Sequence, residues 1–433
     1  MADNEVAVHS VQWSHVLSVG HILRAFRIAL WPPSKLLLCL AALVITIGAA
    51  ILLDMAFETN VGGMSFAENM REVYYLAAGR GTSWALTSEN LMSTRGFYYS
   101  PLDALRHVVE LTRLYWQATP WFAFLNTLIG ILVWTFFGGA VSRIVALQFA
   151  RDERPTVTEA LRFACKRYVS LVASPLALFI VIALIAIPAF FVAGLVLVIP
   201  FVGELVAGAL FFLTIGLGVV LTFLFLFGVA SLGLQMPAIG AEGRDAFDAI
   251  SRGVNYVFTR PWKYILYTAF SLLYLCFTFV VVRLFTFLVL KVPYASLKLW
   301  PWIGRQAEDG TPGKLARVWV EPAMQDLWRM PAGAAGTELV AAVLVSIFII
   351  ILIGLMLAFI PSFILSAQTI IYFLLRRQID FKDLEEVYTE DDEESPGLAR
   401  LEKTEEAVVE PEPPAAGSEA EQPAEESDSE AES

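Results

Sequence analysis

Histidines are the most recognisable candidates for metal chemistry in this sequence, and their spacing predicts no metal site. The four are His9, His15, His21 and His107, and none belongs to a His-Glu-x-x-His motif or an equivalent one. The first three lie six residues apart, which on a helix directs successive side chains about 120° apart. They would not converge on one ion, so we interpret them as part of a polar N-terminal segment.

Motifs for nucleophilic or phosphate chemistry are also missing from the sequence. It contains no Gly-x-Ser-x-Gly, no P-loop and no Gly-x-Gly-x-x-Gly in a strand context. An intramembrane protease would need paired aspartates, or a serine with a histidine or lysine, deep in its spans. We find neither, so the sequence predicts a non-enzymatic protein without a metal ion or cofactor.

Arg283 is the one ionisable residue well inside an apolar stretch. A charge at the centre of a membrane helix costs about 2.5 to 3.5 kcal/mol on insertion scales, and such residues are usually paired or functional. Judged by height in the membrane, the nearest countercharge is Glu204. We predict a charge pair between Arg283 and Glu204, with a snorkelling arginine and a substrate or ion site as alternatives.

Six apolar stretches must position these residues, and they place the protein in a membrane. The hydrophobic fraction is 57%, only 17% of residues are charged, and the mean hydropathy is +0.64, all outside the range of soluble domains. About 20 apolar residues suffice for a helix to cross the hydrocarbon core. The predicted spans are residues 36–55, 121–147, 171–200, 205–230, 264–290 and 339–376.

Basic residues in short loops predict the orientation of these spans. The segment 149–167 carries Arg151, Arg154, Arg162, Lys166 and Arg167, and such loops remain in the cytoplasm. We therefore expect both termini to lie in the cytoplasm. We expect the membrane to be a bacterial inner (plasma) membrane. A minimal turn at 201–204 and two longer loops, 56–120 and 291–337, would lie outside.

Amphipathic, basic stretches precede three of the spans, at 22–30, 159–168 and 248–257. Each is expected to form a helix in the headgroup layer, with its arginines near anionic lipids. The fold class we predict is therefore all-α, a polytopic integral membrane protein with about six transmembrane helices as three hairpins with interfacial amphipathic helices. Residues 142–161 align without gaps on 231–250, which indicates either an internal repeat or shared composition.

Three regions follow from this layout: a cytoplasmic N-terminal segment (1–33), a membrane domain (34–377) and an acidic tail (378–433). The tail holds 21 acidic against three basic residues, a composition that predicts disorder. It would either solvate the protein or bind a basic protein partner.

Small residues recur at every fourth position on two spans, forming ridges that let helices approach closely. These are Gly138, Ser142, Ala146 and Ala150 on the second span, and Gly354, Ala358, Ser362 and Ser366 on the sixth. The alternative interpretation is polar lining of a pore, but the other spans offer mainly apolar side chains. We expect these ridges to pack helices together.

A short sequence resemblance supports a multi-span architecture. At residues 245–252, followed by Arg260-Pro-Trp-Lys263 and a span, the chain resembles the bacterial YciC-like proteins and the membrane domains attached to some glycerophosphodiester phosphodiesterases. The resemblance covers about 30 residues directly and implies no catalytic residue, because the phosphodiesterase chemistry of such fusions belongs to a soluble domain. We expect a membrane-organising, assembly or partner-binding protein; the alternative is a transporter or channel for a small or lipid-like substrate.

Overall fold

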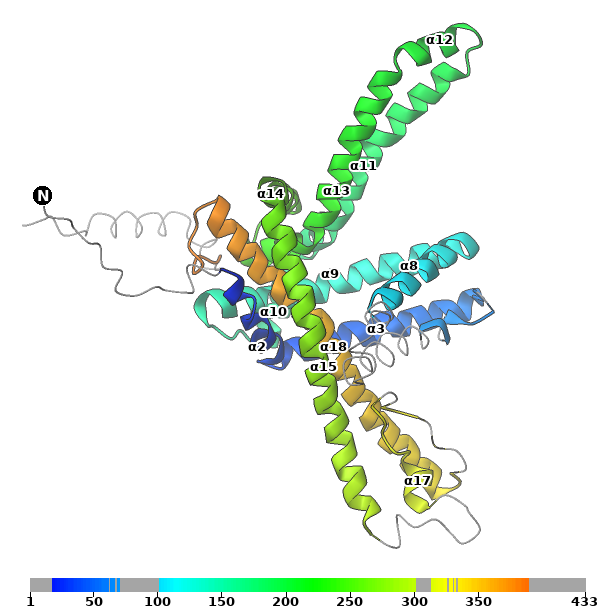
Figure 1. Cartoon of the computed structure of the whole chain (residues 1–433), viewed down its shortest axis with the longest axis vertical. Helices are drawn as coiled ribbons and strands as arrows, with labels where there is room; N and C mark the ends of the chain where they lie inside the picture. The colour runs from blue at the N-terminus through cyan, green and yellow to red at the C-terminus, as the bar shows by residue number, and fades with distance from the viewer. Residues whose placement is uncertain are drawn as a thin grey trace, which may run out of the picture. The chain divides into compact units, whose positions relative to one another are not determined.

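The computed structural model describes residues 18–61, 63–66, 68–70, 101–300, 313–324, 327–329, 331 and 334–388. Its regular structure within these residues is helical, and six helices are long and apolar enough to cross a membrane, which confirms the predicted all-α class. They are α3 (Ser34–Phe57), α9 (Pro120–Arg151), α11 (Tyr168–Leu197), α13 (Phe211–Glu242), α15 (Pro261–Lys298) and α18 (Thr337–Ile379) (Figure 1).

The chain divides into two compact units, Met1–Val387 and Tyr388–Ser433. All helices named here belong to the first unit. The disorder predicted for the tail beyond residue 388 lies outside the described residues, as do His9, His15 and parts of both predicted outer loops.

The turn predicted between the third and fourth spans is larger than expected. Residues Val202–Ala209 form a short helix, α12, and α13 begins only at Phe211 instead of residue 205. Gly203 allows this reversal, because a Cβ there would lie 2.0 Å from the carbonyl oxygen of Val196. Hydropathy is high throughout this segment, so the sequence pattern did not reveal the break.

Each of the three predicted interfacial stretches forms a helix directly before a span. They are α2 (Arg24–Leu30), α10 (Val157–Lys166) and α14 (Ala246–Thr259). Thr156 caps α10 in a capping box with Glu159, which satisfies free backbone N–H groups of the first turn. Asp245 is the N-cap residue of α14, and it takes the place of Thr156 in the alignment of 142–161 on 231–250. The two helices thus begin at matched positions.

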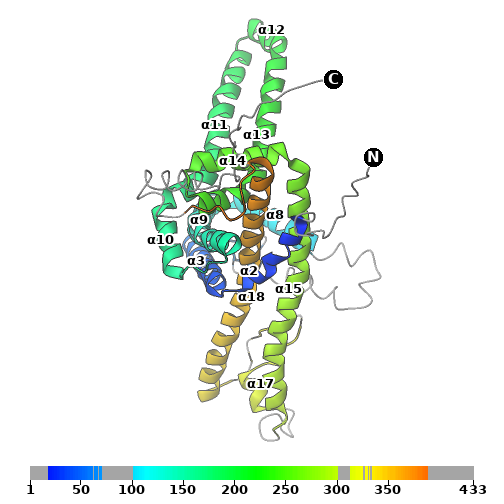
Figure 2. The same ribbon diagram turned by 90° about the vertical axis from the view of Figure 1, so that its left-hand side faces the viewer.

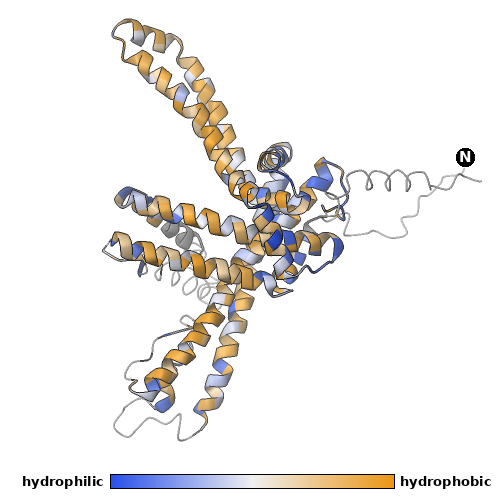
Figure 3. Ribbon diagram, turned by 180° about the vertical axis from the view of Figure 1, so that it is seen from behind, coloured by the Kyte–Doolittle hydropathy of each residue, from blue (hydrophilic) through white to orange (hydrophobic). Residues whose placement is uncertain are grey.

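The core lies where α9, α13 and α18, the second helix of each span pair, pack against one another. Their buried residues concentrate toward the C-terminal ends, for example Ile144 of α9, Leu234 of α13 and Tyr372 of α18. Elsewhere, large apolar side chains such as Phe191 and Phe212 are exposed, as lipid-facing surface would be. Hydrophilic residues gather near the shared ends of the helices, whereas the spans are mostly hydrophobic (Figure 3).

The predicted ridge on α18 faces α2 and α3. A Cβ at Gly354 would lie 2.8 Å from a methyl group of Leu40, and the Ser362 hydroxyl donates to the Ala29 carbonyl at 2.9 Å. Ala358 and Ser366 are buried. This ridge therefore holds an interfacial helix and the first span against the last.

The predicted ridge on α9 faces the other two helices of the core. A Cβ at Gly138 would lie 2.9 Å from Met236 Sδ of α13 and 3.7 Å from a methyl group of Leu365 of α18. Ser142 and Ala146 are buried, whereas Ala150 at the helix end is half-buried. The four residues thus lie on one packed side of α9, and the packing loosens toward the C-terminal end of the helix.

Candidate functional site

A buried ion network joins α13, α14 and α18 at the end of the core. Glu242, the last residue of α13, lies with Oε1 3.1 Å from Arg376 Nε and with Oε2 2.9 Å from Arg252 Nη1. The Tyr372 hydroxyl donates to Glu242 Oε1 at 2.9 Å. Side-chain exposure is 6% for Glu242 and 2% for Arg376, so these charges stabilise each other with little help from water.

Asp380 supplies a second carboxylate to this network. It accepts a hydrogen bond from the Tyr256 hydroxyl, and Arg252 Nη1 lies 3.4 Å from its Oδ2. Burial and the hydrogen bond to Asp380 raise the pKa of Tyr256, so the phenol remains a neutral donor. Because this pKa is raised, the stability from this contact is present at neutral pH and is lost only as strongly alkaline pH ionises the phenol.

The residues that follow α18 belong to the packed structure, which corrects the predicted tail boundary at residue 378. Arg376 Nη1 donates to the Glu386 carbonyl at 2.8 Å, and Arg151 Nη2 donates to the Val387 carbonyl at 3.1 Å. Val387 is buried. The acidic composition of this stretch concealed its role, because the contacts use backbone carbonyls and one apolar side chain.

Ending the chain at Val387 is expected to leave its stability unchanged, whereas ending it at Ile379 should lower the free energy of unfolding by about 3 kcal/mol. The shorter chain loses the partners that Asp380 and Val387 offer to Arg252, Tyr256 and Arg151, and each such hydrogen bond contributes about 1 kcal/mol. Thermal unfolding of both chains in detergent measures this. Equal melting temperatures would contradict the packing of 380–387.

Arg283 binds a different partner from the one predicted. Its side chain is fully buried, and Nη2 donates to the Met324 carbonyl at 2.7 Å. This carbonyl belongs to the segment before α18, near the side-by-side helices α15 and α18 (Figure 2). Glu204 instead lies on α12 and lines a cavity of about 550 Å³ between α11 and α13. The structure therefore does not bring the two charges together, because they belong to different helix pairs.

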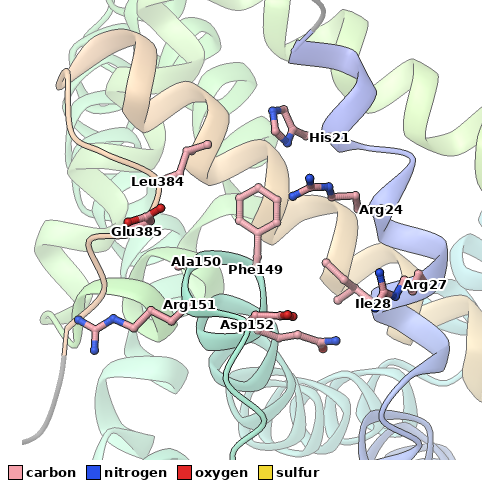
Figure 4. A pocket seen from close by; sticks show the side chains of 11 residues that line it. His21, Arg24, Arg27, Ile28, Phe149, Ala150, Arg151, Asp152, Leu384 and Glu385 are labelled. Atoms are coloured by element: carbon pink, nitrogen blue, oxygen red, sulfur yellow. The ribbon is translucent and has the colours of Figure 1, made fainter. Parts of the chain in front are cut away.

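A surface pocket of about 940 Å³ opens beside α2 and the end of α9. Figure 4 shows its walls: Arg24 and Arg27 extend from α2, Arg151 and Asp152 lie at the end of α9, and Glu385 approaches from the segment after α18. His21 and Phe149 also line it, with ring centroids 6.1 Å apart. The sequence placed basic residues at interfacial helices but did not reveal this pocket, because three distant segments form it.

One wall of this pocket is fixed by a buried polar contact. The Lys35 ammonium donates to Gln148 Oε1 and to the Trp31 carbonyl, and Gln148 Nε2 donates to the same carbonyl at 2.9 Å. Lys35 is fully buried. These bonds connect the corner between α2 and α3 to the end of α9, so the pocket has a defined shape.

Metal ligands do not gather in the part of the chain that the structure describes: no three His, Cys, Asp or Glu side chains are placed to hold an ion there. The chain matches no family model, no curated protein and no solved structure. The resemblance to YciC-like proteins therefore stays a prediction.

Proposed function

We propose that this chain is a non-enzymatic, multi-pass protein of a bacterial inner membrane that organises anionic lipid around the cytoplasmic ends of its spans. The observation that carries the proposal is the set of three short helices, α2, α10 and α14, each of which precedes an apolar helix and packs by its apolar face on a helix of the core. On α10, Ala160 and Phe163 are buried, whereas Arg162 and Lys166 are exposed. Basic side chains so placed attract anionic headgroups.

The corners between interfacial helices and spans support the same proposal. Trp262 is 81% exposed at the start of α15, between the exposed side chains of Arg260 and Lys263. Trp31 is 55% exposed in the corresponding place before α3. Tryptophan beside lysine or arginine is typical of the membrane–water interface, so both corners suit the headgroup layer.

The lipid part of this proposal is tested in nanodiscs containing equal amounts of phosphatidylglycerol and phosphatidylcholine. We expect the wild type to retain phosphatidylglycerol preferentially, and Arg162→Gln/Lys166→Gln to weaken this preference by about 2 kcal/mol, since each basic residue near an anionic surface contributes about 1 kcal/mol. Native mass spectrometry counts the retained lipids. The matched control, Arg113→Gln/Lys314→Gln, removes two exposed basic residues that the predicted topology places outside, and should behave as wild type. A wild type without preference would contradict the proposal.

The acidic tail gives the proposed function a second component, the binding of a basic protein partner. Residues 388–433 hold 17 acidic and two basic residues, a charge density that attracts basic surfaces. Pull-downs with the full chain and with a chain ending at Val387 compare the partners captured. Identical partner sets would exclude a docking role for the tail.

A further inference from the structure

Unmatched charges of both signs line the surface pocket. The side chains of Arg24 and Arg27 are exposed and, within the described residues, have neither a hydrogen bond nor an ion pair; the same holds for the side chains of Asp152 and Glu385. Arg24 and Arg27 lie three residues apart on α2 and therefore share one face of that helix. Figure 4 shows Arg24 and Arg27 on the α2 wall, Glu385 on the opposite wall, and Asp152 between them at the end of α9. A ligand carrying both charges would match both groups at once.

The place of the pocket in the fold indicates where such a ligand comes from. The pocket lies at Arg151, where the apolar helix α9 ends, and beside α2, which packs on α18 through the Ser362–Ala29 hydrogen bond. The end of a membrane span lies at the level of the lipid headgroups. A pocket of about 940 Å³ is within the usual range for small-molecule sites and exceeds the size of one headgroup.

We propose that this pocket binds the phosphoethanolamine headgroup of a membrane lipid, with the phosphate on Arg24 and Arg27 and the ammonium on Asp152 and Glu385. Arginine binds phosphate through charge-assisted hydrogen bonds, and an ammonium donates to carboxylates in the same way. A choline headgroup has no N–H donor for the carboxylates. A glycerol headgroup has no cation to pair with the carboxylates, so the net negative charge of that lipid disfavours it beside them. The inference deepens the proposed lipid-organising function and rests on it.

The test uses the full chain in nanodiscs of phosphatidylethanolamine, phosphatidylglycerol and phosphatidylcholine in equal amounts. Native mass spectrometry should find phosphatidylethanolamine retained by the wild type, and about tenfold less of it on Arg24→Gln/Arg27→Gln, the expected loss for charged hydrogen bonds. Asp152→Asn/Glu385→Gln should shift retention toward phosphatidylglycerol. Asparagine also tolerates the left-handed backbone of residue 152, whose φ is 55°. Melting temperatures confirm that each variant is folded.

A control on α10 separates this inference from the broader proposal. Arg162→Gln/Lys166→Gln should weaken the preference for phosphatidylglycerol but keep phosphatidylethanolamine, because neither residue lines the pocket. Equal retention of phosphatidylethanolamine by the wild type and Arg24→Gln/Arg27→Gln would overturn the pocket and leave the lipid-organising function intact. Retention of phosphatidylcholine as strong as that of phosphatidylethanolamine would also overturn it. Displacement of the lipid by low concentrations of soluble phosphoethanolamine would identify a soluble ligand instead and overturn the lipid assignment.

Discussion

Arg376→Met is expected to lower the free energy of unfolding by about 3–5 kcal/mol, the usual cost of removing one partner from a buried ion pair. Arg376 is almost completely buried, and its guanidinium lies beside Glu242 and donates to the Glu386 carbonyl. Methionine fills much of the same volume but leaves the Glu242 carboxylate with Arg252, 2.9 Å from Oε2, and the half-exposed Arg244, 3.4 Å from Oε2, as its neighbouring cations. The loss therefore reports the missing buried cation at Glu242 Oε1 and not a cavity.

Thermal or denaturant unfolding in detergent measures this effect, and the double variant Glu242→Gln/Arg376→Met provides the control. Glutamine at position 242 carries no charge that needs Arg376. The loss of stability in the double variant should therefore be smaller than the sum of the losses in the two single variants. Additive losses, or a loss below about 1 kcal/mol for Arg376→Met, would contradict the energetic role of the network. Arg377→Met is a second control. It removes an arginine from the same end of α18 without removing a contact to Glu242.

The six long apolar helices and the three short helices that precede spans were predictable, because each depends on a local pattern. About 20 consecutive apolar residues define a span, and alternating basic and apolar residues at helical spacing define α2, α10 and α14. The ends were less predictable. Helix α18 was predicted to end at residue 376 and ends at Ile379, because polar residues at the end of a membrane helix remain helical wherever other helices cover them.

The contacts between helices were not predictable, because a single sequence gives height in the membrane but no lateral position. Arg283 and Glu204 were paired by height, yet α15 packs on α18 while α12 packs on α11 and α13. The ion network combines residues from α13, α14 and α18, and no motif connects Glu242 with Arg376 in the sequence. Small residues at every fourth position were the one sequence signal that pointed to particular helix faces.

Gly240 of α13, which the ridge pattern did not include, lies directly against the backbone of α9. A Cβ at this position would lie 3.2 Å from the backbone nitrogen of Arg143 and 3.3 Å from Ser142 Cβ. Backbone atoms cannot rotate away, so a larger side chain must push the two helices apart. Gly240→Leu is expected to destabilise the protein by about 3 kcal/mol, the upper part of the usual range for overpacked cores.

Gly216→Leu is the matched control, because Gly216 lies on the same helix and has no atom within 4 Å of a built Cβ. There leucine should be neutral or stabilise α13 by up to about 1 kcal/mol, since glycine is a poor helix former. Unfolding in detergent compares the two variants, and cysteine crosslinking between α9 and α13 detects their separation directly. Equal stability of Gly240→Leu and Gly216→Leu would mean that α9 and α13 do not meet at Gly240.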